Sequence, residues 1–343
     1  MNSLILYFTA PRRVSLRVEG LPDPGPGEAR VHTRLSAISS GSELLIYRGE
    51  FPEDMAVDET ITALSGKFAY PQAYGYSSVG EVAELGAGVD PAWLGRKVFA
   101  FQPHASAFVA PIEALILLPD GLPEEEAVFL PNMETAINFL MDGAPLIGEQ
   151  VAVLGQGIVG LLTTALLARF PLASLVTLDR YPLRRRASVD LGAQVSLEAG
   201  SPEAVSEALR ALQGGRAYPG ADLVYELSGN PAALEQAIAL CGFHGRVVIG
   251  SWYGSKPASL DLGGRFHRGR MRLISSQVSS LTPELSGRWD KTRRFQVAWE
   301  MLDAIKPSRL ITQRFPITQA EQAYRLLNDN PVETIQVVLT YDA

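Results

Sequence analysis

Three glycines in the middle of the chain have the spacing and the surroundings of a phosphate-binding turn. Gly155, Gly157 and Gly160 follow the apolar run Val151–Leu154 and lead into a second apolar stretch. The first glycine permits a tight turn, the second lets the backbone approach a pyrophosphate, and the third lets a helix pack closely on the strand. The amides and the positive dipole end of that helix attract phosphate. The segment therefore predicts a dinucleotide-binding turn rather than a purely structural one.

An acid at the end of the next apolar run extends this predicted nucleotide site. Asp179 ends the run Leu175–Leu178, at the distance from the glycines where a ribose-binding carboxylate belongs. Such a carboxylate accepts from both ribose hydroxyls and repels a 2′-phosphate, which favours NAD. Arg180 can stack on adenine or grip a phosphate, so NADP remains an alternative. The residues predicted to bind the cofactor are Gly155, Gln156, Gly157, Ile158, Val159, Gly160, Asp179, Arg180, Ser228, Gly229, Gly250 and Ser251.

The composition indicates an ordinary globular protein with room for two domains. The chain has 343 residues, of which 47% are hydrophobic and 20% charged, and its net charge is −7. The basic run Arg184–Arg186 is expected on a solvated helix face, so no nucleic-acid surface is indicated. No apolar run approaches the roughly 18 residues that span a bilayer, and the first residues lack a signal pattern. We therefore expect a cytoplasmic protein that binds neither nucleic acid nor membrane.

The single cysteine limits the redox and metal chemistry of the chain. Cys241 has no second cysteine with which to form an intrachain disulfide or a site of several thiolates. It stands in an apolar stretch, predicted as the end of a helix, just before Gly242. Free cysteines are among the most buried residues, so a core thiol is expected rather than a nucleophile.

Elements of two kinds must position these residues. Up to about residue 135 the chain consists of short β-like stretches bounded by Pro and Gly, which predicts an irregular, mostly antiparallel β domain. These stretches are 13–18, 29–38, 80–85 and 97–101. A helix over 123–142 then leads into a regular alternation of strands and helices. The strands are predicted at 151–154, 175–178, near 195, and at 222–227, 246–249 and 271–275.

The alternation predicts a doubly wound parallel sheet of six strands. One of its helices is expected to begin after a Ser201 cap, with Pro202 in its first position. The tail adds helices near 292–305 and 319–328 and a strand over 335–340, which indicates a return to the first domain.

This order of domains resembles the medium-chain dehydrogenase/reductase superfamily. The resemblance rests on SAISSGSEL (36–44), YGYSSVGEV (74–82), GQGIVG (155–160), DLVYELSG (222–229) and GRVVIGS (245–251). It implies a GroES-like irregular β-barrel catalytic domain, residues 1–135 and 284–343, and a Rossmann domain, residues 136–283. Ser276-Gln277 and RWDKTRR (288–294) resemble the branch typified by bacteriochlorophyllide dehydrogenases. The resemblance further implies a homodimer formed near residues 272–280.

The chain departs from its zinc-dependent relatives at the positions that the resemblance assigns to metal ligands. Zinc binds thiolate, imidazole or carboxylate, and neutral hydroxyls are poor ligands. The four histidines show no ligand spacing. We therefore predict a zinc-independent protein with no metal site. The positions concerned are Ser40, Tyr76, Ser77 and Pro131, and the histidines are His32, His104, His244 and His267.

Without a metal, another group must protonate or polarise a substrate oxygen. Tyr76 stands in place of a metal ligand and could donate to an alkoxide, or could simply pack under the barrel rim. Ser42 falls where the family has a proton-relay hydroxyl, the alternative being a turn cap. Thr135 falls where the family has a hydroxyl near the nicotinamide. Glu134 could position water or substrate, or be a solvated helix acid, and His104 ranks below these candidates as a structural residue.

The resemblance implies hydride transfer between NAD(H) and a carbonyl or secondary alcohol, a small-molecule substrate bound in an interdomain cleft. One alternative is a conjugate reductase of enones or quinones, in which hydride goes to carbon. Another is a nucleotide-binding protein without catalysis that acts as a redox sensor. The aromatic residues within Phe51–Pro71 are compatible with a large planar or apolar substrate, or with aromatic packing of a long loop.

Overall fold

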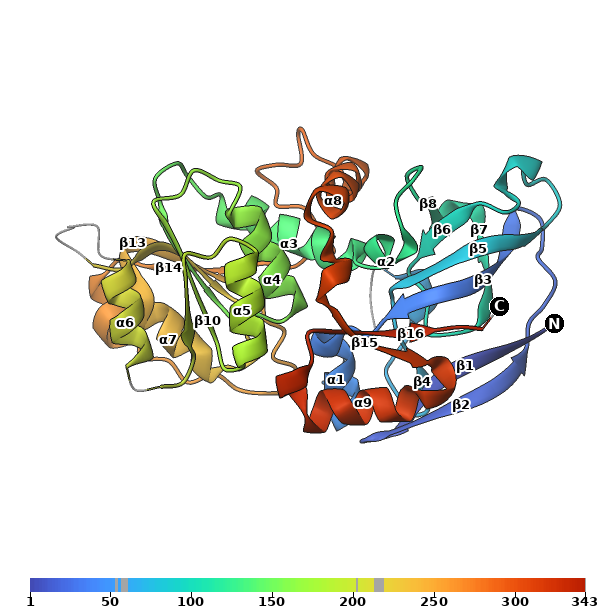
Figure 1. The fold of residues 1–343 in the computed structure, drawn as a ribbon, viewed down its shortest axis with the longest axis horizontal. Coiled ribbons are helices and arrows are strands. Elements are labelled where there is room, and N and C mark those ends of the chain that lie inside the picture. Colours follow the sequence, from blue (N-terminus) through green and yellow to red (C-terminus); the bar gives the residue numbers. More distant parts are fainter. Residues whose placement is uncertain (53–54, 57–60, 202, 213–218, 343) are drawn as a thin grey trace. The chain divides into compact units, whose positions relative to one another are not determined.

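The computed structural model describes residues 1–52, 55–56, 61–201, 203–212 and 219–342, which form two compact units. The first, which we call the β unit, comprises Met1–Pro131 and Leu302–Ala343, and the second, the Rossmann unit, comprises Asn132–Met301. Figure 1 shows the elements of both. The boundaries predicted from the sequence lay at 135/136 and 283/284. Pro202, the predicted first residue of a helix, lies outside the described residues.

The Rossmann unit contains the predicted doubly wound sheet. Its six described strands are all parallel and lie in the order β11-β10-β9-β12-β13-β14. The strand order therefore reverses between β9 and β12, and ligands of such sheets bind beyond the carboxyl ends of the strands at that point. The strands are β9 (Gln150–Leu154), β10 (Ser174–Asp179), β11 (Val195–Glu198), β12 (Ala221–Glu226), β13 (Cys241–Ile249) and β14 (Arg272–Ser275).

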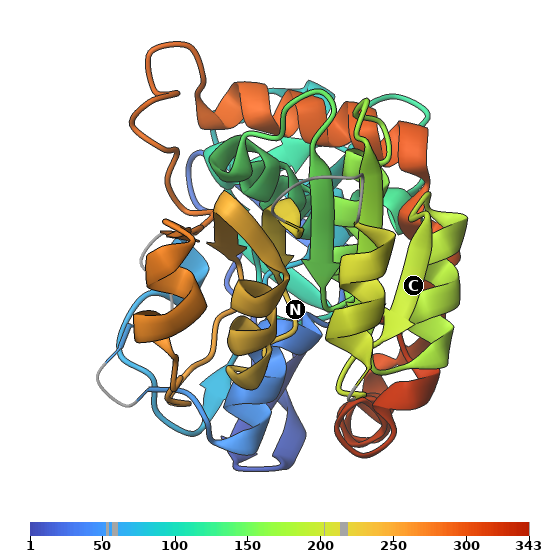
Figure 2. The same cartoon turned by 90° about the vertical axis from the view of Figure 1, so that its left-hand side faces the viewer.

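Helices cover both faces of this sheet (Figure 2). Val151 and Val153 of β9 belong to one buried cluster with residues of α3 and α4, whereas Ala152 and Leu154 belong to another with residues of α6 and α7. Burial on both faces explains why β9 is a continuous apolar run from Val151 to Leu154. The helices that begin in or next to this unit are α3 (Leu130–Gly143), α4 (Ile158–Leu167), α5 (Pro182–Asp190), α6 (Ala204–Ala211) and α7 (Ala232–Leu240), and α8 (Lys291–Ile305) begins near its end.

The β unit is built on a mixed sheet in the order β15-β16-β3-β5-β6-β8, with β7 also paired to β3, and on a smaller sheet, β2-β1-β4. Strands of the larger sheet are β3 (Glu28–Ala37), β5 (Ser78–Leu85), β6 (Lys97–Ala100), β7 (Ala107–Pro111), β8 (Leu115–Leu117), β15 (Ile311–Pro316) and β16 (Gln336–Thr340). Strands of the smaller sheet are β1 (Asn2–Ala10), β2 (Arg13–Gly20) and β4 (Gln72–Ala73). The fold class predicted from the sequence is confirmed.

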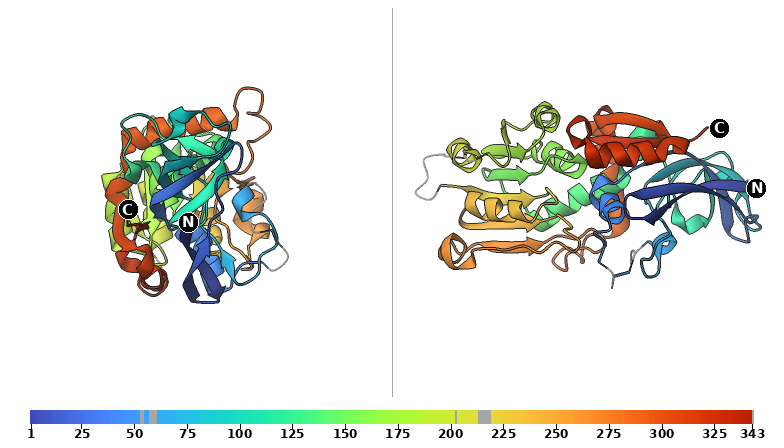
Figure 3. Two further views of the ribbon diagram at one scale, coloured as in Figure 1. Left: turned by 90° about the vertical axis from the view of Figure 1, so that its right-hand side faces the viewer. Right: turned by 90° about the horizontal axis from the view of Figure 1, so that it is seen from below.

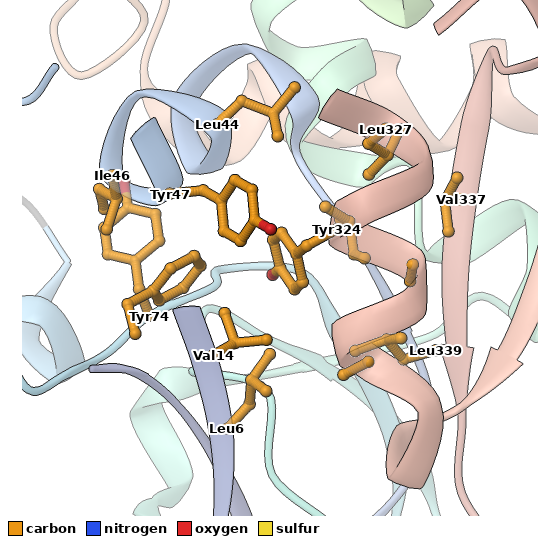
Figure 4. Close-up of a cluster of buried hydrophobic side chains, with 14 of the residues drawn as sticks. Leu6, Val14, Leu44, Ile46, Tyr47, Tyr74, Tyr324, Leu327, Val337 and Leu339 are labelled. Atoms are coloured by element: carbon orange, nitrogen blue, oxygen red, sulfur yellow. The ribbon is translucent and has the colours of Figure 1, made fainter. Parts of the chain in front are cut away.

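The C-terminal tail completes the β unit. Strand β16 pairs antiparallel with β3, with Val338 opposite Ala37, so the last strand of the chain extends a sheet of early strands (Figure 3). Helices α1 (Ser40–Arg48) and α9 (Ala320–Asp329) share one buried cluster with β1. In that cluster Tyr47 stacks on Tyr324 with 5.6 Å between ring centroids (Figure 4). The tail therefore holds α1 in place through side-chain packing.

Three of the predicted elements differ in the structure. The helix predicted to begin after a Ser201 cap, α6, has Glu203 as its N-cap. The helix predicted over 123–142 is divided into α2 (Glu124–Ala127) and α3. Pro131 has no amide hydrogen with which to bond the carbonyl of Ala127, four residues earlier, and it fits the first turn of a new helix. Cys241 is not in a helix, because the backbone becomes extended there and begins β13. Its thiol is buried, as predicted, and burial raises its pKa to about 12.

Strand β1 was not predicted. Leu6 and Phe8 are completely buried and alternate with less buried neighbours, but the continuous apolar sequence LILYF conceals this period of two. Among the helices that the structure describes, none is both long and apolar enough to cross a membrane.

Candidate active site

The glycine turn after β9 has a distinct geometric reason for each glycine. Gly155 has a φ of +89°, and a β-carbon there would lie 2.6 Å from the backbone of Leu227. A β-carbon on Gly160 would collide with the carbonyl oxygen of Gly155, so the helix packs directly on the turn. A β-carbon on Gly157 would meet nothing within 4 Å. The turn therefore leaves open space beside Gly157, at the first turn of α4.

Asp179 organises this turn. Its Oδ2 accepts from the backbone amide of Gln156 at 2.6 Å, and its Oδ1 accepts from the amide of Tyr181 at 2.8 Å. The side chain of Gln156 folds inward, where its Oε1 accepts from Thr164 at 2.9 Å. Ile158 and Val159 begin α4, and Ile158 is buried in the core. Asp179 thus orders the glycine turn and retains further lone pairs on both oxygens.

The basic run beside Asp179 is not the solvated helix face expected from the sequence. The guanidinium of Arg184 lies over the ring of Tyr181, 4.9 Å from its centroid, and burial lowers the pKa of Arg184. Arg185 donates to the carbonyls of Asp179 at 3.0 Å and Arg180 at 2.8 Å, and these bonds hold the chain after β10. Arg180 itself is exposed.

The ends of β12 and β13 are joined by a buried carboxylate and two serines. Glu226 is completely buried, and its carboxylate accepts from the hydroxyl of Ser228 and, at 2.5 Å, from that of Tyr253. Ser251 accepts from the amide of Gly229 at 2.8 Å. These bonds order the ends of β12 and β13, on the β12 side of the switch point. Gly250 is packed so closely against Leu227 that a β-carbon there would lie 2.6 Å from Cδ2 of that side chain.

Glu134 is not a solvated helix acid, because it is 3% exposed and paired with a buried arginine. Its Oε1 accepts from Arg294 Nη2 at 2.7 Å and from Nε at 3.1 Å, and Arg294 also donates to Asn138 at 2.6 Å. Burial raises the pKa of Glu134, while the charge of Arg294 opposes that change. Thr135, the next residue of α3, is half-buried. The predicted catalytic roles of Glu134 and Thr135 remain predictions.

The β unit brings three hydroxyl groups together at the start of α1. The phenol oxygen of Tyr76 forms a hydrogen bond with Ser39 Oγ and lies 3.2 Å from Ser42 Oγ. Tyr76 is half-buried, so its ring packs partly against the core while its hydroxyl stays in this cluster. The cluster therefore contains the predicted residues Tyr76 and Ser42 together with Ser39, which was not predicted as a site residue.

Local geometry explains how α1 presents these serines. Ser39 is the N-cap, a position where a serine hydroxyl normally accepts from a backbone amide of the first turn. Here it makes no such bond, because the hydroxyl is turned to Tyr76. At the other end of the helix, Gly49 adopts the left-handed conformation with a φ of 74° and closes α1.

A buried array of polar side chains lies directly beneath this cluster. Glu43 and His104 are both completely buried, and Nε2 of His104 is 3.1 Å from Oε2 of Glu43. The same carboxylate oxygen accepts from the hydroxyl of Tyr324, and Nδ1 of His104 is 2.7 Å from Oγ of Ser36. Ser36 in turn lies 2.7 Å from the hydroxyl of Tyr341.

Hydroxyl and apolar side chains occupy the positions where the resemblance implied zinc ligands. Ser77 is buried, and its hydroxyl donates to the carbonyl of Val128 at 2.5 Å. Tyr76 belongs to the hydroxyl cluster, and Pro131 has no ligand atom in its side chain. Within the described part of the chain, no group of three or more His, Cys, Asp and Glu side chains could hold a metal ion. This donor set does not fit zinc.

The aromatic residues after α1 pack on one another. The rings of Phe51 and Phe68 have centroids 4.7 Å apart, and Phe68 meets Tyr70 edge-on at 4.9 Å. Tyr70 donates its hydroxyl to the carbonyl of Ile46, near the end of α1. The described residues of this segment therefore favour the alternative of aromatic packing over a substrate surface.

Comparisons with known proteins agree with this architecture. Residues 159–295 match the family model of zinc-binding dehydrogenases. Sorbitol dehydrogenase of Bacillus subtilis (strain 168) is 25% identical over 281 residues, which cover 73% of this chain and 74% of that protein. These matches support membership of the medium-chain dehydrogenase/reductase superfamily. The finer resemblance to bacteriochlorophyllide dehydrogenases stays a prediction.

Solved structures of dehydrogenases have the same fold as this chain. The alcohol dehydrogenase RspB of Escherichia coli CFT073, solved with NADH, is similar with a TM-score of 0.79 and 20% identity over 99% of both chains. A putative zinc-binding dehydrogenase of Sinorhizobium meliloti 1021, solved with NADP, is similar with a TM-score of 0.78 and 19% identity over 99% of both chains. At such identities the likeness shows the fold alone.

Proposed function

We propose that this protein is a zinc-independent, NAD(P)-dependent oxidoreductase that transfers hydride between the nicotinamide cofactor and a carbonyl or secondary alcohol. The hydroxyl cluster of Tyr76, Ser39 and Ser42 carries the proposal, because it stands where the family's zinc relatives are expected to hold their metal. The relative sorbitol dehydrogenase supports oxidoreduction of an alcohol.

The residues of the Rossmann unit fit a dinucleotide. The open space at Gly157 would admit a pyrophosphate to the amides at the start of α4, where the helix dipole favours negative charge. Asp179 can still accept from the ribose hydroxyls through its remaining lone pairs, and its charge opposes a 2′-phosphate. We therefore propose NAD as the preferred cofactor, which when bound supplies or accepts the hydride.

Tyr76 is proposed as the proton donor to the substrate oxygen as hydride arrives at carbon. After the proton has left, the hydroxyls of Ser39 and Ser42 can rotate to donate to the phenolate oxygen. In the oxidative direction the phenolate oxygen of Tyr76 accepts the proton of the alcohol. The cluster thus replaces a Lewis acid by hydrogen-bond donors held in place beforehand.

A conjugate reductase remains the second candidate, because a donor set without a Lewis acid serves it equally well. Hydride would then go to the carbon of an enone, and Tyr76 would only need to stabilise or protonate the enolate. Product analysis separates the two candidates, since one yields an alcohol and the other a saturated ketone.

The test combines cofactor titration with a substrate screen. NADH and NADPH binding is followed by fluorescence, and turnover is measured on a panel of secondary alcohols, including sorbitol, and of ketones and enones. Tyr76→Phe should retain cofactor affinity and lose kcat by about 10²-fold or more, the usual contribution of a general acid. Tyr7→Phe, which removes a phenol hydroxyl from β1, serves as the matched control. Unchanged kcat in Tyr76→Phe would remove the proposed donor, and a protein that binds neither cofactor would contradict the function itself.

A further inference from the structure

The hydroxyl cluster is assembled from two separate parts of the chain. Ser39 and Ser42 belong to the start of α1, whereas Tyr76 follows β4 and Gly75. A shift of either part would open the contacts of the Tyr76 oxygen with its two serines. Proton transfer depends steeply on such distances, since a displacement of about 1 Å can cost a large factor in rate. Something must therefore hold the two parts in register.

One carboxylate oxygen of the buried array reaches the first part. Oε1 of Glu43 accepts from the backbone amide of Ser39 at 2.7 Å, the same residue whose hydroxyl meets Tyr76. The other oxygen, Oε2, is held by His104 and Tyr324. Burial, and after it the charge of Glu43, raises the pKa of Tyr324 well above its ordinary value, so this phenol remains a donor.

His104 reaches the second part. A β-carbon built on Gly75 would lie 2.8 Å from Cδ2 and 2.9 Å from Nε2 of the imidazole, so the ring packs directly on the backbone before Tyr76. Gly75 has a φ of +124°, a conformation that other residues rarely adopt. The amide of His104 also donates to the carbonyl of Tyr74 at 3.3 Å. Ser36 of β3 fixes the far side of the ring at 2.7 Å.

We propose that Glu43 and His104 act together as a positioning pair that holds Ser39 and Tyr76 in register for proton transfer. The pair itself does not touch the substrate. Its link to the cluster runs through the backbone amide of Ser39 and the packing on Gly75, so the pair acts by setting distances.

This inference rests on the proposed function, and conservative variants test it. Glu43→Gln keeps an oxygen that can accept from the Ser39 amide, whereas Glu43→Ala loses it. If the pair acts by position, Glu43→Ala should lower kcat by about tenfold or more with little change in KM. Glu43→Gln should stay within about threefold of wild type, because the acceptor geometry survives. Glu126→Gln is the control, since Glu126 is a buried carboxylate of the same unit whose partner is Ser308.

A second readout does not require turnover. Tyrosine labelled with ¹³C at Cζ reports the environment of the phenol oxygen, and Tyr76→Phe assigns the signal of Tyr76. The signal should move in Glu43→Ala and remain at the wild-type position in Glu43→Gln and Glu126→Gln. If Glu43→Ala does not fold, His104→Gln, which removes the ring from Gly75, should move the same signal.

The outcomes separate the two claims. An unmoved Tyr76 signal with wild-type kcat in Glu43→Ala, or in His104→Gln where that variant replaces it, would overturn the positioning pair. A loss in Glu43→Gln as large as that in Glu43→Ala would also overturn it, because charge rather than position would then be essential. A wild-type protein that turns over no substrate would contradict the proposed function, while the Tyr76 signal would still decide the positioning of the phenol.

Discussion

At Ser39 the contribution to helix stability can be measured separately from the contribution to catalysis. As the N-cap of α1 it would be expected to stabilise the helix, yet its hydroxyl bonds Tyr76 rather than a backbone amide. Ser39→Ala should therefore cost less than about 0.5 kcal/mol of unfolding free energy, where a working N-cap costs ~1 kcal/mol. It should still lower kcat, because the phenolate loses one donor.

Urea denaturation and steady-state kinetics on the same preparations measure both effects. Ser42→Ala, which removes the more distant hydroxyl of the cluster, is the comparison variant and should lower kcat less. A loss of stability near 1 kcal/mol with unchanged kcat would show that Ser39 is an ordinary cap.

Asp179 combines two tasks at one position. Its oxygens accept from the amides of Gln156 and Tyr181, and its charge is proposed to oppose NADPH. Asp179→Asn removes the charge at nearly the same size, so NADPH affinity relative to NADH should rise by about tenfold, or ~1.4 kcal/mol. Fluorescence titration with both cofactors measures this ratio. Asp190→Asn, at an exposed position of the same unit, is the control, and an unchanged ratio in Asp179→Asn would contradict the proposed selectivity.

Among the elements, α3 and α8 are joined by the buried pair Glu134 and Arg294. Arg294→Ala would leave a buried carboxylate without its partner and should lower the unfolding free energy by about 3–5 kcal/mol. Arg210→Ala, which removes one partner of an exposed pair, should change stability by less than ~0.5 kcal/mol. Chemical denaturation at pH 7 gives both values.

The pH dependence of Arg294→Ala gives an independent check. Burial already raises the pKa of Glu134, and loss of Arg294 removes the charge that opposes this rise. The folded state of the variant then binds a proton more tightly than the unfolded state, so stability is lost as pH rises through the folded pKa. The deficit should shrink when the pH is lowered from 7 to 5. A deficit independent of pH would mean that lost packing, not the unpaired carboxylate, dominates.

The elements show what the sequence could and could not predict. The Rossmann strands were found because burial on both faces produces apolar runs between turns, as in Val151–Leu154. Tyr76 was selected only through the family resemblance. Glu43 and Tyr324 were missed because they lie 281 residues apart in the sequence, and a contact between such distant residues leaves no local pattern. In addition, a glutamate in a first helical turn looks like an ordinary helix acid. The division of the helix at Pro131 was foreseeable from the proline itself.

At the scale of the whole molecule, the single cysteine reports the opening of the Rossmann unit. Cys241 is buried and its pKa is raised to about 12, so its thiol should resist labelling at pH 8 until the unit opens. NADH at about 100 times its Kd should add ~2.7 kcal/mol to the free energy of opening, because only the closed state binds it. Labelling should therefore slow by about 100-fold. Thiol labelling with and without NADH measures this. Fast labelling unaffected by NADH would contradict the placement of Cys241 in the core of a cofactor-binding unit.

The central claim, that hydride transfer here proceeds with a tyrosine and two serines in place of zinc, has one direct test. The purified protein is treated with a strong chelator, and zinc content and NAD(P)-linked turnover are measured on the same sample before and after. We expect far less than one zinc per chain at the outset and unchanged turnover after chelation. One zinc per chain, with activity that is lost on chelation and restored by zinc, would contradict the account.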